Sequence, residues 1–148
     1  MRIVLGVIFT GLLILTGCGT PTGKPTEIAN ACPIENDHQY LEVSGYIVPG
    51  GSVFCSNIGG GPVACGLDFS DSAGGARKMG VDIPQGSGAN AIGELPSGYK
   101  KEDIKIRDNS GNPIDLNSKV KVTGKMSIAP GAGTTPGVCF MQVEKIEK

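Results

Sequence analysis

The sequence is poor in the side chains on which most catalytic sites depend. It has no tryptophan, three tyrosines and a single histidine, His38. No serine stands in a Gly-x-Ser-x-Gly pattern, and the glycines at 59–61 are not followed by the Lys-Ser or Lys-Thr pair of a phosphate-binding loop. His38 has no nucleophile that the sequence can place beside it. We therefore interpret His38 as a surface residue and predict no catalytic residue and no cofactor.

The amino end has the composition of a signal peptide. Arg2 is followed by an apolar run over residues 3–15. One positive charge, an apolar stretch and small residues near a cleavage point are the parts of a secretory signal. Thirteen residues in a helix rise only about 20 Å, less than the roughly 30 Å of the hydrocarbon core of a bilayer. We predict that residues 1–17 are a signal peptide that is removed.

The end of this segment, Leu15-Thr16-Gly17-Cys18, resembles the lipobox of bacterial prolipoproteins at all four positions. The resemblance implies that the thiol of Cys18 receives a diacylglycerol and that its freed amine is acylated, so that several acyl chains anchor the protein. The expected location is the cell membrane or the outer membrane, with the domain facing the periplasm or the cell exterior. Gly19 stands where an Asp would resemble an inner-membrane retention signal. The alternative is a secreted protein in which Cys18 is incidental.

The mature chain divides into a tether and one domain. The stretch after Cys18 is rich in Pro and Thr, which bury little surface and resist regular structure. We expect residues 18–39 to form the lipidated end and a flexible tether, and residues 40–148 to form a domain. The chain has 24 glycines and 10 prolines, so we expect many turns and a modest core that needs covalent support.

Four cysteines remain after Cys18. An even number of cysteines in an exported domain indicates disulfides, and four cysteines allow three pairings. We favour Cys55 with Cys65, which would close a compact loop, and Cys32 with Cys139, which would tie the two ends of the domain together. Four thiolates could instead hold zinc, but the sequence has no Cys-x-x-Cys pair. We predict two disulfides and no metal.

Alternation of apolar and polar residues dominates the rest of the chain, and helical periodicity is nearly lacking after residue 17. This pattern predicts half-buried strands. We expect strands at 40–48, 63–69, 76–83, 119–128 and 138–146. Residues 84–103 are expected to form a long connection with at most one short helix. The segments 103–107 and 112–116 flank a turn signal at Asp108 and are expected to form a small hairpin.

The order of these segments resembles an OB fold. The resemblance rests on Val43-Ser-Gly-Tyr-Ile, on Leu67-Asp-Phe-Ser-Asp before a glycine turn, on Lys119-Val-Lys-Val-Thr-Gly-Lys-Met, and on Val143-Glu-Lys-Ile-Glu. A closed barrel also removes the exposed edges that short strands would otherwise leave. The expected fold is an all-β, five- to six-stranded OB-like barrel stabilised by disulfides, with a small β-sandwich as the alternative.

The oxygen-bearing residues at 108, 110 and 112 have the spacing of the first ligands of a calcium loop. However, Pro113 occupies the position of the expected glycine, and Lys119 stands where the closing glutamate would be. A plain turn is the favoured interpretation.

Charge is distributed unevenly along the mature chain, because residues 18–97 are acidic overall and residues 98–148 are basic. A basic face is one interpretation, and lysines on solvated strand edges are the other. If the domain binds a partner, the predicted surface combines two aromatic residues with three lysines. These residues are Tyr46, Phe54, Lys119, Lys121 and Lys125.

These observations favour a non-enzymatic, membrane-anchored module that binds a protein or glycan partner of the cell envelope. We expect no nucleic-acid ligand, because few aromatic residues are candidates for stacking bases: Tyr40, Tyr46, Tyr99 and Phe54. One alternative is an envelope hydrolase that uses Asp68, Asp71 and Asp82. Another is a purely structural surface lipoprotein.

Overall fold

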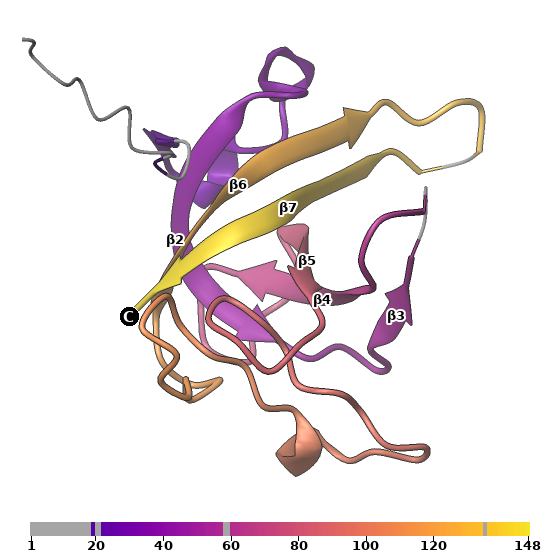
Figure 1. Ribbon diagram of the computed structural model, residues 1–148. Coiled ribbons are helices and arrows are strands. Elements are labelled where there is room, and N and C mark those ends of the chain that lie inside the picture. Colours follow the sequence, from indigo (N-terminus) through magenta and orange to yellow (C-terminus); the bar gives the residue numbers. More distant parts are fainter. Residues whose placement is uncertain (1–18, 20–21, 58–59, 135) are drawn as a thin grey trace, which may run out of the picture.

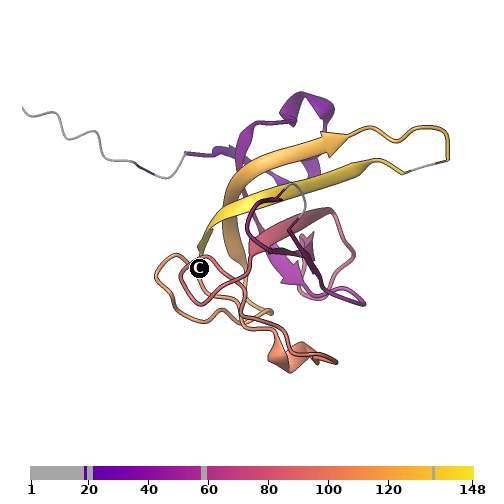
Figure 2. The ribbon, with the colours of Figure 1, turned by 45° about the vertical axis from the view of Figure 1, so that its right-hand side comes forward.

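The computed structural model describes residues 19, 22–57, 60–134 and 136–148. The predicted signal peptide and Cys18 lie outside the described residues. Seven strands and three short 3-10 turns follow one another along the described chain (Figures 1 and 2). They are β1 (Lys24–Thr26), η1 (Ile28–Asn30), η2 (Ile34–Asn36), β2 (Tyr40–Val48), β3 (Phe54–Ser56), β4 (Ala64–Ser70), β5 (Met79–Pro84), η4 (Lys101–Asp103), β6 (Val120–Ala129) and β7 (Val138–Glu147). This part of the chain contains no helix with the length and hydrophobicity needed to cross a bilayer.

Five strands close into a barrel with OB-like topology, as predicted. Around the barrel, β2 pairs with β4, β4 with β5, β5 with β7, β7 with β6, and β6 again with β2. Four of these pairings are antiparallel, and β5 with β7 is parallel. Closure is possible because β2 changes partner along its length: residues 40–45 pair with β6, and residues 46–48 pair with β4. The ring of pairings rules out the alternative of two separate sheets.

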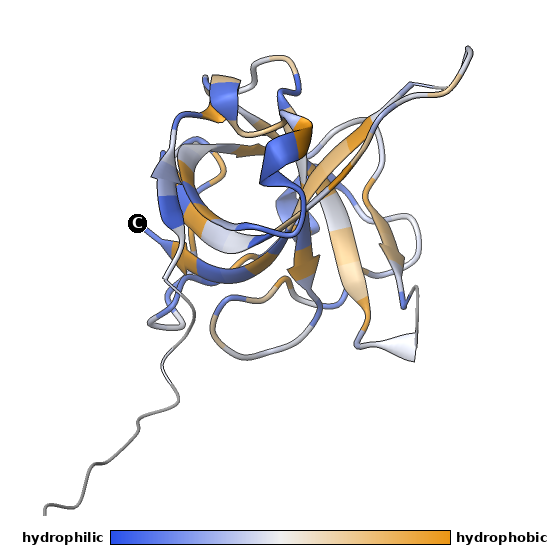
Figure 3. Cartoon of the chain, turned by 90° about the horizontal axis from the view of Figure 1, so that it is seen from above, coloured by the Kyte–Doolittle hydropathy of each residue, from blue (hydrophilic) through white to orange (hydrophobic). Residues whose placement is uncertain are grey.

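The apolar residues of the alternating pattern predicted from the sequence point inward and fill the barrel interior. Hydrophobic and hydrophilic residues alternate along the strands in Figure 3, and the inward set is almost completely buried. The largest of these inward side chains are Leu41, Ile47, Phe69, Met79, Ile83, Met126, Met141 and Ile146. Gly124 lies at a β-bulge in β6, where a Cβ would be 2.0 Å from the carbonyl oxygen of Gln142. The two strands approach so closely there that only glycine fits.

The connection between β5 and β6 lies at one end of the barrel (Figure 1). Its buried isoleucines, among them Ile92, Ile106 and Ile114, join the core and close that end. As predicted, its regular structure is limited to one short turn, η4. The expected hairpin over 103–107 and 112–116 is reduced to a single bridge between Arg107 and Pro113. The predicted turn is present: the carboxylate of Asp108 accepts hydrogen bonds from the backbone N–H groups of Ser110 (2.8 Å) and Asn112 (2.9 Å).

Ordered structure begins before residue 40, where the sequence placed the start of the domain. β1 pairs in parallel with residues 41–43 of β2, and Ala31 is fully buried. The sequence does not indicate β1, because this strand is defined by its pairing with β2, and a Pro- and Thr-rich composition gives no sign of such pairing. Residues 24–39, which were expected to belong to the tether, therefore include a paired strand and two 3-10 turns.

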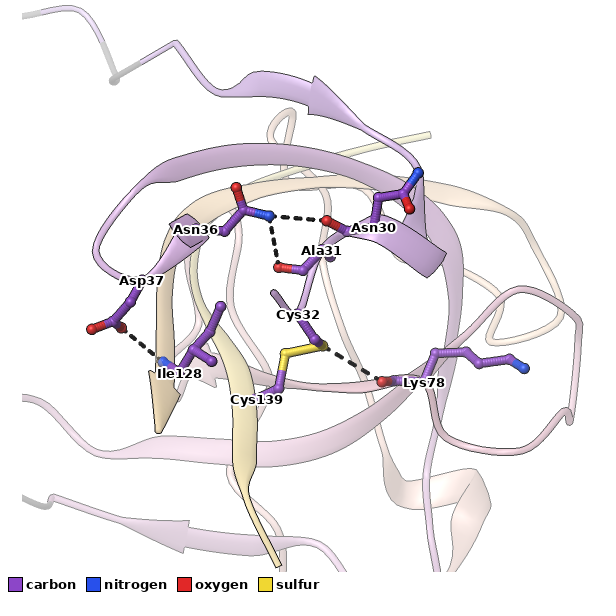
Figure 4. The surroundings of a disulfide bond; sticks show 8 residues. All are labelled: Asn30, Ala31, Cys32, Asn36, Asp37, Lys78, Ile128 and Cys139. Atoms are coloured by element: carbon purple, nitrogen blue, oxygen red, sulfur yellow. Dashed lines mark hydrogen bonds between the residues drawn. A yellow bond between two sulfur atoms is a disulfide. The ribbon is translucent and has the colours of Figure 1, made fainter. Parts of the chain in front are cut away.

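Both favoured disulfides are present. Cys32 and Cys139 are joined with a Cα–Cα separation of 5.7 Å, and Cys55 is joined to Cys65. Figure 4 shows the Cys32–Cys139 bond and two nearby side chains, Asn36 and Asp37, that form hydrogen bonds with backbone groups. The Asn36 amide donates to the carbonyl oxygen of Ala31, and the Asp37 carboxylate accepts from the N–H of Ile128 at 2.8 Å. The amino-terminal segment is thus fixed to the β6–β7 hairpin.

Candidate functional site: a cleft on the outer face of the barrel

A cleft of about 460 Å³ lies on the outer face of β4, β5 and β7, beneath the segment that carries β3. Its volume is within the range of ligand pockets. It exists because β3 pairs with the first half of β4 and so stands beside the barrel as an extra strand. The described lining residues are Phe54, Ser56, Gly61, Pro62, Ala64, Gly66, Asp82, Pro84, Phe140, Gln142 and Val143.

The segment that covers the cleft is held at two points. The disulfide joins Cys55 of β3 to Cys65, its direct partner in β4. Before β3, the hydroxyl of Tyr99 accepts a hydrogen bond from the backbone N–H of Val53. These links fix the wall of the cleft in the absence of a ligand, so that less conformational freedom is lost on binding.

Two phenylalanines give the cleft its apolar character. Phe54 is 71% exposed, an unusual position for a large aromatic side chain in a small domain. Phe140 of β7 is half-buried and lines the same hollow. Exposed aromatic surface beside a concavity is typical of recognition sites.

The polar centre of the cleft is Asp82, on the outward face of β5. It stands between Gly66 of β4 and Gln142 of β7 in the strand register. Burial raises the pKa of the Asp82 carboxyl, and the nearby charge of Arg77 lowers it by a smaller amount. The Arg77 guanidinium is itself bound to Asp68 at 3.3 Å. Among the described residues, Asp82 has no ion-pair or hydrogen-bond partner and is the only charged residue that lines the cleft.

The register continues this arrangement into one row across the outer surface. Phe54 lies opposite Gly66, Gly66 opposite Asp82, Asp82 opposite Gln142, and Gln142 opposite Lys125. Gly66 keeps the middle of the row low, since a Cβ there would be 3.3 Å from Oδ1 of Asp82. The row thus carries an aromatic wall, a gap, a carboxylate and an amide in succession.

The structure places only one of the five predicted site residues in this cleft, namely Phe54. Lys125 belongs to the same row, beyond Gln142. Tyr46 lies opposite Ser70 in the β2–β4 ladder. Lys121 is bound to Glu42 (3.3 Å) and Glu147 (3.1 Å), and these hydrogen bonds raise its pKa.

Lys119, the remaining predicted residue, lines a different hollow of about 550 Å³ beside β1. Its other described lining residues come mainly from the segment 25–29, together with Glu42, Ser44 and Asp71. None of these side chains is aromatic, so we consider the cleft beneath β3 the better candidate for recognition.

The three carboxylates considered for a hydrolase have different surroundings. Asp68 is bound to Arg77, and Asp71 is bound to Lys78 at 3.4 Å. Asp82 alone lines the cleft. General acid–base catalysis by a carboxylate pair needs both groups at one bond of the substrate, and the cleft offers a single carboxylate among its described residues. His38, also considered, is exposed and bound to Asp37 at 3.2 Å.

No family model matches the chain, and no curated protein sequence matches it.

Proposed function

We propose that the chain is a lipoprotein precursor whose mature barrel is a non-enzymatic binding module of the cell envelope. In this proposal residues 1–17 are removed, Cys18 carries the lipid, and the barrel holds a protein or glycan partner at the cell membrane or outer membrane. The single observation that carries the binding role is the cleft under β3, with exposed Phe54 at its wall.

The position of the cleft supports this role. OB-like barrels bind ligands on the face of their second and third strands and at the adjoining loops. In this chain those strands are β4 and β5, and the cleft lies on their outer face. The two disulfides agree with an oxidising compartment outside the cytoplasm.

The proposed anchor places the barrel close to a membrane. Six residue steps separate Cys18 from the first residue of β1, Lys24. A fully extended chain of that length spans at most about 20 Å. A partner of the module would therefore be another component of the membrane surface or a molecule that approaches it closely.

The anchoring half of the proposal is tested by expressing the full-length chain and its Cys18→Ser variant with a clickable fatty acid. We expect the label and membrane association in the unmodified chain and the loss of both in the variant. Membrane association that survives the substitution would contradict a lipid anchor at Cys18.

The binding half is tested by photo-crosslinking in intact cells. The full-length chain carries benzoylphenylalanine at position 54 in one sample and at position 34 in another. Ile34 is a matched control because it is also exposed, at 56%, but lies outside the cleft. We expect a reproducible crosslinked species from position 54 that position 34 does not give. Equal products from the two positions, or none from position 54, would count against the cleft as a binding site.

A further inference from the structure

The unpaired carboxylate of Asp82 narrows the chemistry of the ligand, if the cleft binds a partner as proposed above. A carboxylate that is partly withdrawn from water is costly unless a positive group or hydrogen-bond donors compensate it. No described side chain is bound to the Asp82 carboxylate: Arg77, the nearby positive group, is bound to Asp68, and the opposite residue in β4 is glycine. The compensating group is therefore expected to come with the ligand.

We propose that the cleft receives a lysine or arginine side chain of a partner protein, with Asp82 as the counter-ion and Phe54 and Phe140 in contact with the alkyl part of that side chain.

The walls of the cleft fit such a side chain. A lysine or arginine places apolar methylenes before its charge, and it packs well where apolar surface surrounds one carboxylate. Phenyl rings also attract a cation that lies over their faces. In the cleft, Phe54 stands on one side of Asp82 in the row, and Phe140 lies two residues before Gln142 on the other side.

A glycan would need a different lining. Sugar rings present many hydroxyl groups, and each requires a partner when it is buried. Among the described lining residues, only Ser56, Asp82 and Gln142 have polar side chains. A side chain with one cationic group and an apolar stem matches a lining that is mainly apolar and has one carboxylate, which favours a protein partner over a glycan.

The surrounding charges permit a cation at Asp82. Lys125 is two strands away in the same row, a distance of about 10 Å by strand spacing, which is about one Debye length at physiological ionic strength. Arg77 is nearer but is held by Asp68. Glu144, two residues after Gln142 on the same face of β7, is acidic and does not repel a cation. It accepts a hydrogen bond from the Tyr40 hydroxyl.

The same groups determine how binding depends on pH. Arg77 acts on Asp82 from the preceding loop, and Gln142 lies opposite it in β7; Asp68 of β4 and Glu144 of β7 lie two residues further along their strands, on the same outer face. The raised pKa of Asp82 means that its charge is lost at a higher pH than that of an ordinary aspartate. Affinity for a cationic ligand should therefore fall as the pH drops through that pKa.

The proposal is tested with the full-length chain in detergent, labelled with ¹⁵N and titrated with four hexapeptides that differ at one position. That position carries lysine, arginine, norleucine or glutamate. We expect the lysine and arginine peptides to shift the amide signals of Phe54, Asp82 and Gln142 and to bind at least about tenfold more tightly than the norleucine peptide, which corresponds to about 1.4 kcal/mol. The preference should vanish in Asp82→Asn and persist in Asp115→Asn, a matched change outside the cleft.

A second measurement needs no variant. The lysine peptide is titrated at pH 7 and at pH 4, and its affinity should fall at the lower pH while that of the norleucine peptide stays constant. Equal binding of lysine and norleucine would overturn the cationic ligand and leave the cleft as an apolar binding site, and a preference for glutamate would also overturn it. If no peptide binds but position 54 still crosslinks in cells, the ligand class is wrong and the binding module stands. Failure of both experiments would remove the proposed function as well.

Discussion

Gly66 and Asp82 face each other across the β4–β5 ladder, and a Cβ on residue 66 would lie 3.3 Å from Oδ1 of Asp82. The cleft is therefore open because residue 66 has no side chain. This relationship connects the register of the barrel to the space available for a ligand.

Gly66→Val should reduce crosslinking from position 54 by about tenfold, because the new side chain fills the floor of the cleft and crowds the Asp82 carboxylate. The barrel should still fold, since the substitution points outward. The measurement is crosslinking yield together with the circular dichroism spectrum. Gly51→Val is the control, because a Cβ at position 51 meets no atom within 4 Å. A full yield from Gly66→Val in a folded protein would show that ligands bind elsewhere.

Asp82→Asn should leave the free protein at least as stable as the unmodified chain at pH 7. Burial raises the pKa of Asp82 in the folded state, so its ionised form opposes folding above that pKa. This unfavourable contribution disappears as the pH falls below the pKa of the unfolded chain. The stability advantage of the variant should therefore be present at pH 7 and absent at pH 3, as measured by urea unfolding at the two pH values. A variant that is less stable at pH 7 would show that the Asp82 charge supports the fold.

Removal of the two disulfides should have unequal effects on stability. In the chain-entropy model the Cys32–Cys139 bond, with a sequence separation of 107, contributes about 4 to 5 kcal/mol, and the Cys55–Cys65 bond, with a separation of 10, contributes about 2.5 kcal/mol. Urea unfolding of the two double serine variants measures the difference. Loss of the shorter loop should also weaken crosslinking from position 54, since that bond holds β3 over the cleft. Equal destabilisation by the two changes would contradict the chain-entropy argument.

Asn90→Ala should destabilise the barrel by about 1 to 3 kcal/mol, the usual cost of leaving a buried donor unsatisfied. The Asn90 side chain accepts a hydrogen bond from the N–H of Ile146 at 2.7 Å and so fixes the β5–β6 connection to β7. Its backbone also has a φ of 54°, a conformation that alanine adopts less readily than asparagine. Thermal unfolding provides the measurement. Ser87→Ala, in the exposed part of the same connection, is a suitable comparison and should change the melting temperature little.

The five barrel strands could be predicted from the sequence to within a few residues, because buried inward positions alternate with less buried outward ones along much of each strand. β1 and β3 could not, since each has three residues and is defined by a neighbour and not by its own pattern. The glycines near Phe54 and the Pro and Thr residues near Lys24 predict loops at these positions and no strands. The hairpin expected over 103–107 and 112–116 is only a single bridge for a related reason. Its apolar residues Ile104, Ile106 and Ile114 are spaced as in a strand because they pack into the core at the end of the barrel.

The site was harder to predict than the fold. The sequence indicates Phe54 as a candidate exposed aromatic, but it presents Asp82 only as one of three scattered carboxylates. Their place in one row depends on three successive registers, including the parallel pairing of β5 with β7, and residues 54, 66, 82 and 142 are too far apart in sequence for any local pattern to align them. The alternating lysines of β6 suggest a basic binding face, but Lys121 forms salt bridges with Glu42 and Glu147.

For the lipid anchor proposed at Cys18, the bond between Cys32 and Cys139 has a mechanical consequence. A pull from the membrane reaches β1 first, whose three parallel pairs with β2 are a weak attachment. Beyond them the load arrives at Cys32, where the covalent bond passes it directly to the hairpin of β6 and β7. The pull then enters the barrel at β7, the strand that contributes Phe140 and Gln142 to the cleft, and not at β2.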